Sequence, residues 1–228
     1  MRVSLCLLVW YEIEGCKLDV PKIPYDQFDE VYAVDGGSND GTVEYLESRG
    51  IPVYRQPKKG LNAAYIHAVD VSTCDAVVVF FPKGTSTIED LRKFRPLLEA
   101  GYDIVIASRN IKGGRNEEDD RFIKLRKWCV LALAILAALI WRREGYFVRD
   151  VLHGFKGFTV SAFRRIAPLD YGLSIDIEMI VRSYRLRLKR TEFPTKERHR
   201  PFGQTHFRLF PTGVKLAKYL WHEAKRGD

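Results

Sequence analysis

The chain has 228 residues, of which 46% are hydrophobic and 29% are charged, so a substantial core can form and global disorder is excluded. The net charge of +8 is uneven, because residues 1–106 have a net charge of −5 and residues 107–228 one of +13. A basic half predicts an anionic partner such as a phosphate, a lipid headgroup or nucleic acid, with a solvated basic surface as the alternative. The four cysteines show no CxxC pair and no zinc-ligand spacing, which favours reduced thiols.

The first hundred residues alternate apolar runs of strand length with helical segments. Ser86 and Glu89 form an S-x-x-E capping box, which predicts a helix that begins there and reaches about residue 100. Repeated β-α-β units predict an α/β fold with a mostly parallel central sheet and helices on both faces. The expected strands are 3–10, 31–34, 51–54, 76–81 and 102–107, and the expected helices are 42–49, 61–69 and 86–100.

The pattern changes after residue 107. A helix expected over 121–143 contains an uncharged stretch from Trp128 to Trp141, with basic residues before and after it. That stretch is about 21 Å long, too short for a hydrocarbon core of about 30 Å. A core helix and a helix lying in the membrane interface both remain open. Further along we expect a strand at 155–159, helices capped by Ser161 and Ser174, an irregular basic stretch at 196–207 and a last helix at 211–225.

Polar and aromatic residues follow the expected strands, at the edge where open α/β sheets bind ligands. Tyr11 can face a base, and Asp35 can accept hydrogen bonds from a base N–H or a ribose hydroxyl. Lys59 beside Gly60 offers a cation where the backbone can approach a phosphate closely. Taken singly, Asp35 is also explained as a turn residue and Lys59 as part of a solvated turn. Four such segments in order, at 9–12, 35–42, 58–62 and 81–86, favour a nucleotide site.

Seven segments carry signature-like sequences in order over about residues 3–220. Residues 7–14 (LLVWYEIE) look like P-x-Y-N-E-x-E, 34–42 (VDGGSNDGT) like V-D-D-G-S-x-D-G-T, 59–64 (KGLNAA) like G-K-G-x-x-A-A, 108–114 (SRNIKGG) like S-R-Y-x-x-G-G, 153–156 (HGFK) like S-G-F-R, 174–179 (SIDIEM) like F-x-x-E-L and 200–206 (RPFGQTH) like R-x-x-G-x-S-K. Together they resemble family 2 glycosyltransferases, in particular dolichol-phosphate mannose synthases and other polyprenyl-phosphate sugar transferases.

The resemblance implies one GT-A (Rossmann-like) domain over residues 1–228, with a nucleotide-binding half at 1–107 and an acceptor and membrane-facing half at 108–228. It implies transfer of a sugar, with inversion, from a UDP- or GDP-sugar to a lipid-linked acceptor such as polyprenyl phosphate. The residues that it assigns to the nucleotide-sugar donor are Val9, Tyr11, Glu14, Asp35, Gly37, Lys59, Gly60, Lys83 and Arg109.

The chain departs from the family where a metal should bind. Phe81, Pro82 and Lys83 stand at the place of the D-x-D motif, so both metal-ligating carboxylates are missing and no metal cofactor is expected. In one interpretation the Lys83 ammonium takes the place of the metal, giving a metal-independent transferase. In the other, the chain is a catalytically inactive relative that serves as a binding or scaffold protein. The cations expected to help Lys83 are Lys59, Arg109 and Arg200.

The acceptor decides whether a base is needed. A polyprenyl phosphate is already an anionic nucleophile near pH 7, whereas a hydroxyl acceptor needs a general base, for which Asp176 and Glu178 are candidates. The predicted catalytic residues are therefore Lys83, Asp176 and Arg200. The residues expected to hold the acceptor phosphate are Arg115, Arg121, Lys156, Arg198 and Arg200.

The expected location is the cytoplasmic face of the membrane, with peripheral contact through the stretch from Trp128 to Trp141 and its basic neighbours. Nucleic-acid binding would explain the basic half but neither the ordered motifs nor the apolar helix, so no nucleic-acid partner is predicted. The C-terminal transmembrane helices of many relatives are not found, which leaves a membrane-protein partner or a homo-oligomer open.

Overall fold

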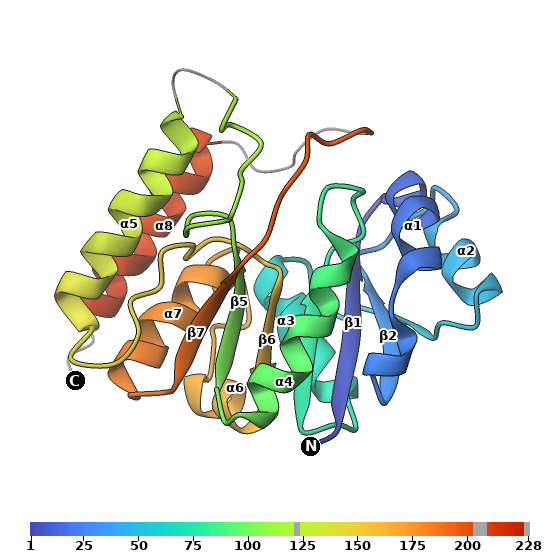
Figure 1. Ribbon diagram of the computed structural model, residues 1–228, viewed down its shortest axis with the longest axis horizontal. Coiled ribbons are helices and arrows are strands. Elements are labelled where there is room, and N and C mark those ends of the chain that lie inside the picture. The colour runs from blue at the N-terminus through green and yellow to red at the C-terminus, as the bar shows by residue number, and fades with distance from the viewer. Residues whose placement is uncertain (121–123, 203–208, 226–228) are drawn as a thin grey trace.

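The central sheet of the computed structural model has the strand order β3-β2-β1-β4-β6-β5-β7 (Figure 1). Neighbouring strands are parallel except at β6, which runs antiparallel to both β4 and β5. The structure describes residues 1–120, 124–202 and 209–225. The α/β fold with a mostly parallel sheet is thus confirmed, and the antiparallel strand is an addition. The strands are β1 (Val3–Val9), β2 (Glu30–Asp35), β3 (Val53–Arg55), β4 (Ala76–Phe80), β5 (Ile104–Ser108), β6 (Lys156–Thr159) and β7 (Arg190–Pro194).

Helices cover both faces of the sheet because the strands are apolar on both sides. Leu5 and Leu7 of β1 pack into one core cluster, while Cys6 and Leu8 pack into the other, as the alternation of a strand requires. The α-helices are α1 (Ile13–Asp19), α2 (Thr42–Ser48), α3 (Leu61–Val71), α4 (Phe94–Glu99), α5 (Leu125–Trp141), α6 (Val160–Ile166), α7 (Ile175–Arg185) and α8 (Leu209–Lys225). Three short 3₁₀ segments are η1 (Val20–Lys22), η2 (Tyr25–Gln27) and η3 (Ile88–Lys93).

Two local predictions are wrong, and one strand was not predicted. Ser86 does not open a helix, because Thr87 precedes the 3₁₀ turn η3 and the α-helix itself begins only at Phe94. Ser161 is not the cap of α6, since Thr159 Oγ1 accepts the backbone N–H of Ala162 at 3.2 Å. β7 was not expected as a strand, because its residues alternate poorly and gain their hydrogen bonds only from β5.

Helix α5 lies at the outside of the molecule, and only one of its faces is buried (Figure 1). Val130, Ala134, Ala137 and Trp141 contribute to the core cluster shared with α7 and α8. Within the described residues, no helix is both long and apolar enough to span a bilayer.

Candidate active site

The carboxyl ends of β1, β2 and β4 lie at one edge of the sheet. Val9 pairs with Asp35 and Leu7 pairs with Phe80, so the chain leaves all three strands at nearly the same level. The segments predicted to hold a nucleotide therefore meet in space, although they are far apart in sequence.

The turn after β2 is organised by Asp35. Its buried carboxylate accepts the backbone N–H groups of Gly37 at 2.8 Å and Ser38 at 3.0 Å, and Gly37 has a φ of 98° that suits glycine. The backbone N–H of Tyr11 donates to Ser38 Oγ at 2.9 Å, which joins the β1 and β2 loops. Asp35 thus shapes the turn, while the Tyr11 ring packs at a tilt against the Trp10 ring and remains exposed, so it could face a base.

The turn before α3 is held by a glycine contact. Gly60 has a φ of 120°, and a Cβ there would lie 3.0 Å from the carbonyl oxygen of Gly172. Lys58 forms a surface ion pair with Asp170, which lies on the same loop as Gly172. Lys59 is exposed beside Gly60, so its ammonium can approach an anion at this edge.

The segment that replaces D-x-D is fixed from two sides. A Cβ on Gly15 would lie 2.1 Å from the carbonyl oxygen of Pro82, and one on Gly154 would lie 2.5 Å from the Phe81 ring. No side chain larger than glycine fits at either position without a shift. The Lys83 ammonium lies 4.7 Å from the centre of the Phe81 ring, a cation–π contact that orients it.

Lys83 and Arg200 lie around one carboxylate. The Arg200 guanidinium donates to Glu12 Oε1 at 2.6 Å, across 188 residues of sequence. Burial lowers the pKa of the Lys83 ammonium below its ordinary value, and the charge of Glu12 opposes that shift while Arg200 adds to it. The charges of Glu197 and Asp176 also act on Lys83, but Glu197 is paired with Arg109 and Asp176 with Lys156, so Lys83 is the cation of this group for which no ion pair is found among the described residues.

Helix α1 supplies a carboxylate that the sequence did not single out. Asp19 accepts the backbone N–H of Gly84 at 2.7 Å and so ties the loop after β4 to α1. Burial raises the pKa of Asp19 to about 6, although that hydrogen bond opposes the rise. Glu14, predicted to bind the donor, is exposed on α1 and pairs with Lys17 at 2.8 Å.

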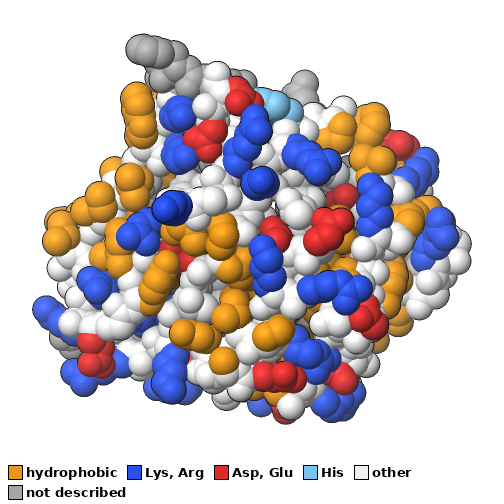
Figure 2. Space-filling model, viewed as in Figure 1, with side chains coloured by type: hydrophobic (Ala, Val, Ile, Leu, Met, Phe, Trp, Pro, Cys, Tyr) orange, Lys and Arg blue, Asp and Glu red, His pale blue; other side chains and the backbone are white. Residues whose placement is uncertain are grey.

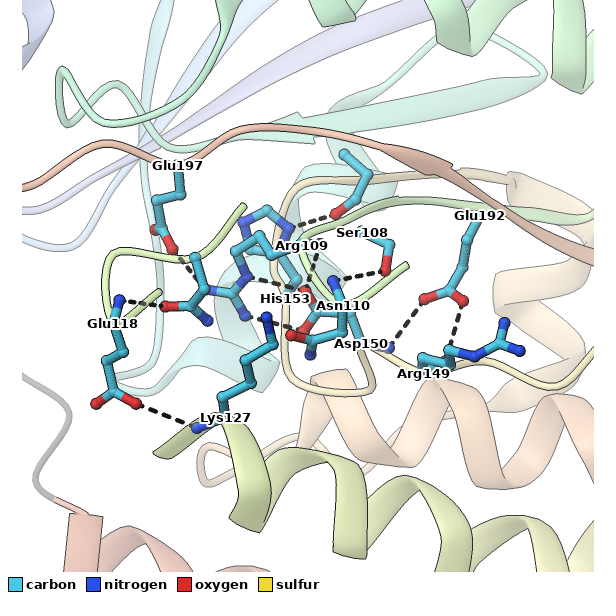
Figure 3. Close-up of polar contacts among 12 residues, drawn as sticks. Ser108, Arg109, Asn110, Glu118, Lys127, Arg149, Asp150, His153, Glu192 and Glu197 are labelled. Atoms are coloured by element: carbon cyan, nitrogen blue, oxygen red, sulfur yellow. Dashed lines mark hydrogen bonds and ion pairs between the residues drawn. The ribbon is translucent and has the colours of Figure 1, made fainter. Parts of the chain in front are cut away.

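A buried network surrounds Arg109 (Figure 3). All three guanidinium nitrogens donate to carboxylates, Nε and Nη2 to Asp150 at 2.8 and 2.9 Å and Nη1 to Glu197 at 2.8 Å. Burial alone would raise the pKa of Asp150, but Arg109 lowers it to about 2. Burial and the charge of Arg109 lower the pKa of His153, whose Nδ1 hydrogen-bonds to the Ala107 carbonyl. A phosphate could bind Arg109 only by displacing a carboxylate.

Both candidate bases are engaged. Asp176 pairs with the fully buried Lys156, whose Nζ lies 2.7 Å from its Oδ1. The fully buried Glu178 pairs with Arg182 at 2.9 Å and accepts the backbone N–H of Leu169 at 2.9 Å. Burial raises the pKa of Glu178 despite these contacts. Lys156, expected at the acceptor phosphate, therefore neutralises a carboxylate inside the protein instead of facing solvent.

Two further predicted acceptor residues, Arg115 and Arg198, lie along the rim of the same edge. Arg115 is exposed and pairs with Asp120 at 2.8 Å. Arg198 is exposed, and its backbone N–H donates to the Thr85 carbonyl at 2.8 Å, which holds the segment after β7 beside the loop after β4. Arg121 lies outside the described residues.

No metal centre is found in the part of the chain that the structure describes, where three or more His, Cys, Asp or Glu side chains nowhere gather in a way that could hold an ion. The residues at the D-x-D position do not fit a divalent cation, because Phe81, Pro82 and Lys83 offer no side-chain oxygen ligand and Lys83 adds a positive charge.

Comparison with known proteins places these features in a family. The sequence profile described as Glycosyl transferase family 2 matches residues 16–167. The chain is 31% identical over 208 residues to glycosyltransferase AglJ of Haloferax volcanii, a match that covers 88% of this chain and 65% of the relative. It is 28% identical over 191 residues to the dolichyl-phosphate hexose transferase of the same organism, covering 84% and 79% of the two chains.

Solved structures share the fold. Glucosyl-3-phosphoglycerate synthase from Mycobacterium tuberculosis, in complex with phosphoglyceric acid, superimposes with a TM-score of 0.73 at 16% identity, over 100% of this chain and 81% of that one. The same enzyme solved with Mn²⁺, UDP-glucose and glycerol 3-phosphate gives the same TM-score, identity and coverage. The architecture is the GT-A fold that the sequence motifs predict.

Proposed function

The chain belongs to glycosyl transferase family 2, and on that premise we propose that it transfers a sugar from a UDP- or GDP-sugar to a lipid-linked phosphate without a metal ion. The dolichyl-phosphate relative supports the class of acceptor. The chain spans 65% of the length of glycosyltransferase AglJ, so the proposal concerns the reaction that this domain can perform.

The donor would bind at the carboxyl ends of β1, β2 and β4. Tyr11 would cover the base, and Lys59 at the turn before α3 would approach the diphosphate. Lys83 and Arg200 together would carry the two positive charges that a divalent ion supplies elsewhere, and would stabilise the leaving nucleoside diphosphate. An arginine can also hold a phosphate through two parallel hydrogen bonds.

The engagement of both candidate bases is the observation that carries the choice of acceptor. A hydroxyl nucleophile needs a free carboxylate, but Asp176 is paired with Lys156 and Glu178 is fully buried against Arg182. A phosphate nucleophile is ionised near pH 7 and needs no base. Direct displacement at the anomeric carbon would then invert its configuration.

The exposed face of α5 supports a membrane location for this acceptor. The nine exposed residues of α5 are all apolar, including Trp128, Leu136 and Leu139, the last with 78% of its surface exposed. A helix on the surface of a soluble protein would carry polar residues on that face. We propose that this face lies in the interface of the cytoplasmic leaflet, with the candidate active site beside the lipid surface.

The test is transfer of a radiolabelled sugar from UDP- or GDP-sugars to polyprenyl phosphate in detergent, with EDTA and separately with Mn²⁺. We expect one nucleotide sugar to yield an organic-extractable product at equal rates under both conditions. Activity only with Mn²⁺ would refute metal independence. If no nucleotide sugar is used and neither UDP nor GDP raises the melting temperature, the chain is the inactive relative.

A further inference from the structure

A basic groove lies beside the C-terminal ends of α5 and α7, at the opposite end of α7 from Asp176. Its volume is about 650 Å³, and the carboxyl-terminal turn of α6 and Glu223 of α8 complete its walls. Ile140 and Trp141 form its apolar side. Five of the lining side chains are arginines: Arg143, Arg165, Arg182, Arg185 and Arg187.

The acid in this groove is already neutralised. Glu223 is buried, with 2% of its side chain exposed, and it accepts hydrogen bonds from Arg182 Nε at 3.2 Å and Arg185 Nη1 at 3.1 Å. Arg182 also donates to the carbonyl of Ile166 at 3.0 Å and thereby satisfies the end of α6. These two arginines are therefore part of the fold and are not offered to a ligand.

The other three arginines surround the opening. Arg143, Arg165 and Arg187 are exposed. Glu144 lies 3.5 Å from Arg187 with both side chains more than half exposed, a contact that contributes little. Arg165 Nη2 donates a long hydrogen bond to the Leu186 carbonyl, at 3.4 Å. The groove thus presents a surplus of guanidinium groups, which match phosphate oxygens in shape and charge.

The groove continues into the apolar face of α5. Ile140 lines the groove and is itself exposed, and Leu136 and Leu139 lie one turn or less before it on the helix. Figure 2 shows hydrophobic side chains along the outer side of the molecule where α5 lies, with Lys and Arg side chains gathered around its lower end. A ligand that suits both surfaces has a phosphate head and an apolar tail.

We propose that this groove binds the phosphate headgroup of an anionic phospholipid, whose acyl chains lie along the exposed face of α5. The inference deepens the membrane contact proposed above and concerns a site apart from the acceptor phosphate at the catalytic edge. It assigns the groove a role in holding the domain on an anionic membrane in one orientation.

Arg187 offers a clean variant. It has a φ of 53°, a left-handed conformation that costs a non-glycine residue energy and that glycine adopts freely. Arg187→Gly therefore removes the guanidinium while relieving strain, and a thermal melt of the variant checks that it is as stable as the intact chain. The test variant combines it with Arg165→Gln. The control combines Arg49→Gln and Lys22→Gln, which remove the same charge from exposed positions outside the groove.

Binding is measured by co-sedimentation with phosphatidylcholine vesicles, with and without phosphatidylglycerol, at low and physiological salt. The intact chain should prefer vesicles with phosphatidylglycerol. Each basic residue near an anionic surface contributes about fivefold in affinity, so the Arg165/Arg187 variant should bind about 30-fold more weakly. The Arg49/Lys22 control should lose less than about threefold, because charges away from the contact are screened.

The outcomes separate the proposals. Equal losses in test and control variants, or no preference for phosphatidylglycerol, would overturn the headgroup site while leaving the α5 contact standing. A third result would also overturn the headgroup site: the intact chain binds pyrophosphate in solution, the test variant does not, and neither prefers vesicles with phosphatidylglycerol. The groove would then be assigned to a soluble phosphate. No binding to any vesicle would refute the membrane contact of α5 as well. The proposed transferase function would still be tested separately, by the transfer assay in detergent.

Discussion

Replacing Lys83 by alanine tests the central chemical claim. The Lys83 ammonium is held by the Phe81 ring at 4.7 Å and lies among the charges of Glu12 and Arg200. A unit charge about 4 Å from a phosphate contributes roughly 4 kcal/mol at an effective dielectric constant of about 20. Loss of one such stabilising group costs about 10²- to 10³-fold in turnover. We expect Lys83→Ala to reduce transfer by that factor in EDTA.

The assay measures transfer of labelled sugar to polyprenyl phosphate. Binding of UDP and GDP is measured separately by calorimetry. Lys83→Arg keeps the positive charge and should retain more activity than Lys83→Gln, which keeps length without charge. Lys22→Ala, at an exposed position on η1, is the control for loss of a surface lysine. The reasoning fails if Lys83→Ala retains transfer within about threefold of the intact chain, since a metal substitute contributes far more.

Other predictions follow from burial and charge. Asp150→Asn breaks a buried ion pair and should lower the free energy of unfolding by about 3–5 kcal/mol at pH 7, measured by urea titration. The difference between variant and intact chain should shrink as the pH falls toward 2, because Asp150 of the intact chain is then protonated as well. The pKa of Asp19 is raised to about 6, so the folded state binds a proton at Asp19 more tightly than the unfolded state does. The protonated Asp19 side chain therefore stabilises the fold below about pH 4, and this contribution is lost as the pH rises from about 4 to 6. Asp19→Asn should flatten that dependence in thermal melts, and an unchanged slope would contradict it. Leu136→Gln with Leu139→Gln should leave the melting temperature unchanged, because both side chains are exposed, but should weaken binding to vesicles at least tenfold.

The sequence predicted what local chemistry determines. Runs of apolar residues defined the buried strands, and the glycine-rich segment after β2 predicted the turn that Asp35 and Gly37 form. Gly36, which departs from the family signature, has a local reason that only the structure reveals, because a Cβ there would lie 3.1 Å from the Trp10 ring. The order of motifs along β1, β2 and β4 was enough to predict that these segments meet at one edge of the sheet.

Long-range pairing was beyond the sequence. Nothing local indicates that Glu12 meets Arg200, or that Arg109 is engaged by Asp150 and Glu197. The spacing of charged residues constrains neighbours on one helix, whereas these partners come from separate elements that only tertiary packing brings together. The same limit made Lys156 look like a surface cation, because its burial against a carboxylate depends on the position of β6 in the sheet.

The arrangement of charges around Lys83 explains how a fixed cation could serve where a metal ion serves elsewhere. A single ammonium carries half the charge of a divalent ion, and in the proposed mechanism Arg200, whose charge acts on Lys83, would supply the other half. In the structure Glu12 holds that arginine through a charge-assisted hydrogen bond, and it therefore acts as an internal counter-ion. The diphosphate of a donor would compete with Glu12 for Arg200. Lys83 and Arg200 would therefore both face the donor only when the diphosphate replaces Glu12 as the negative partner of Arg200. Such an exchange keeps the partly buried Arg200 paired with a negative group in both states, so its charge is never left uncompensated.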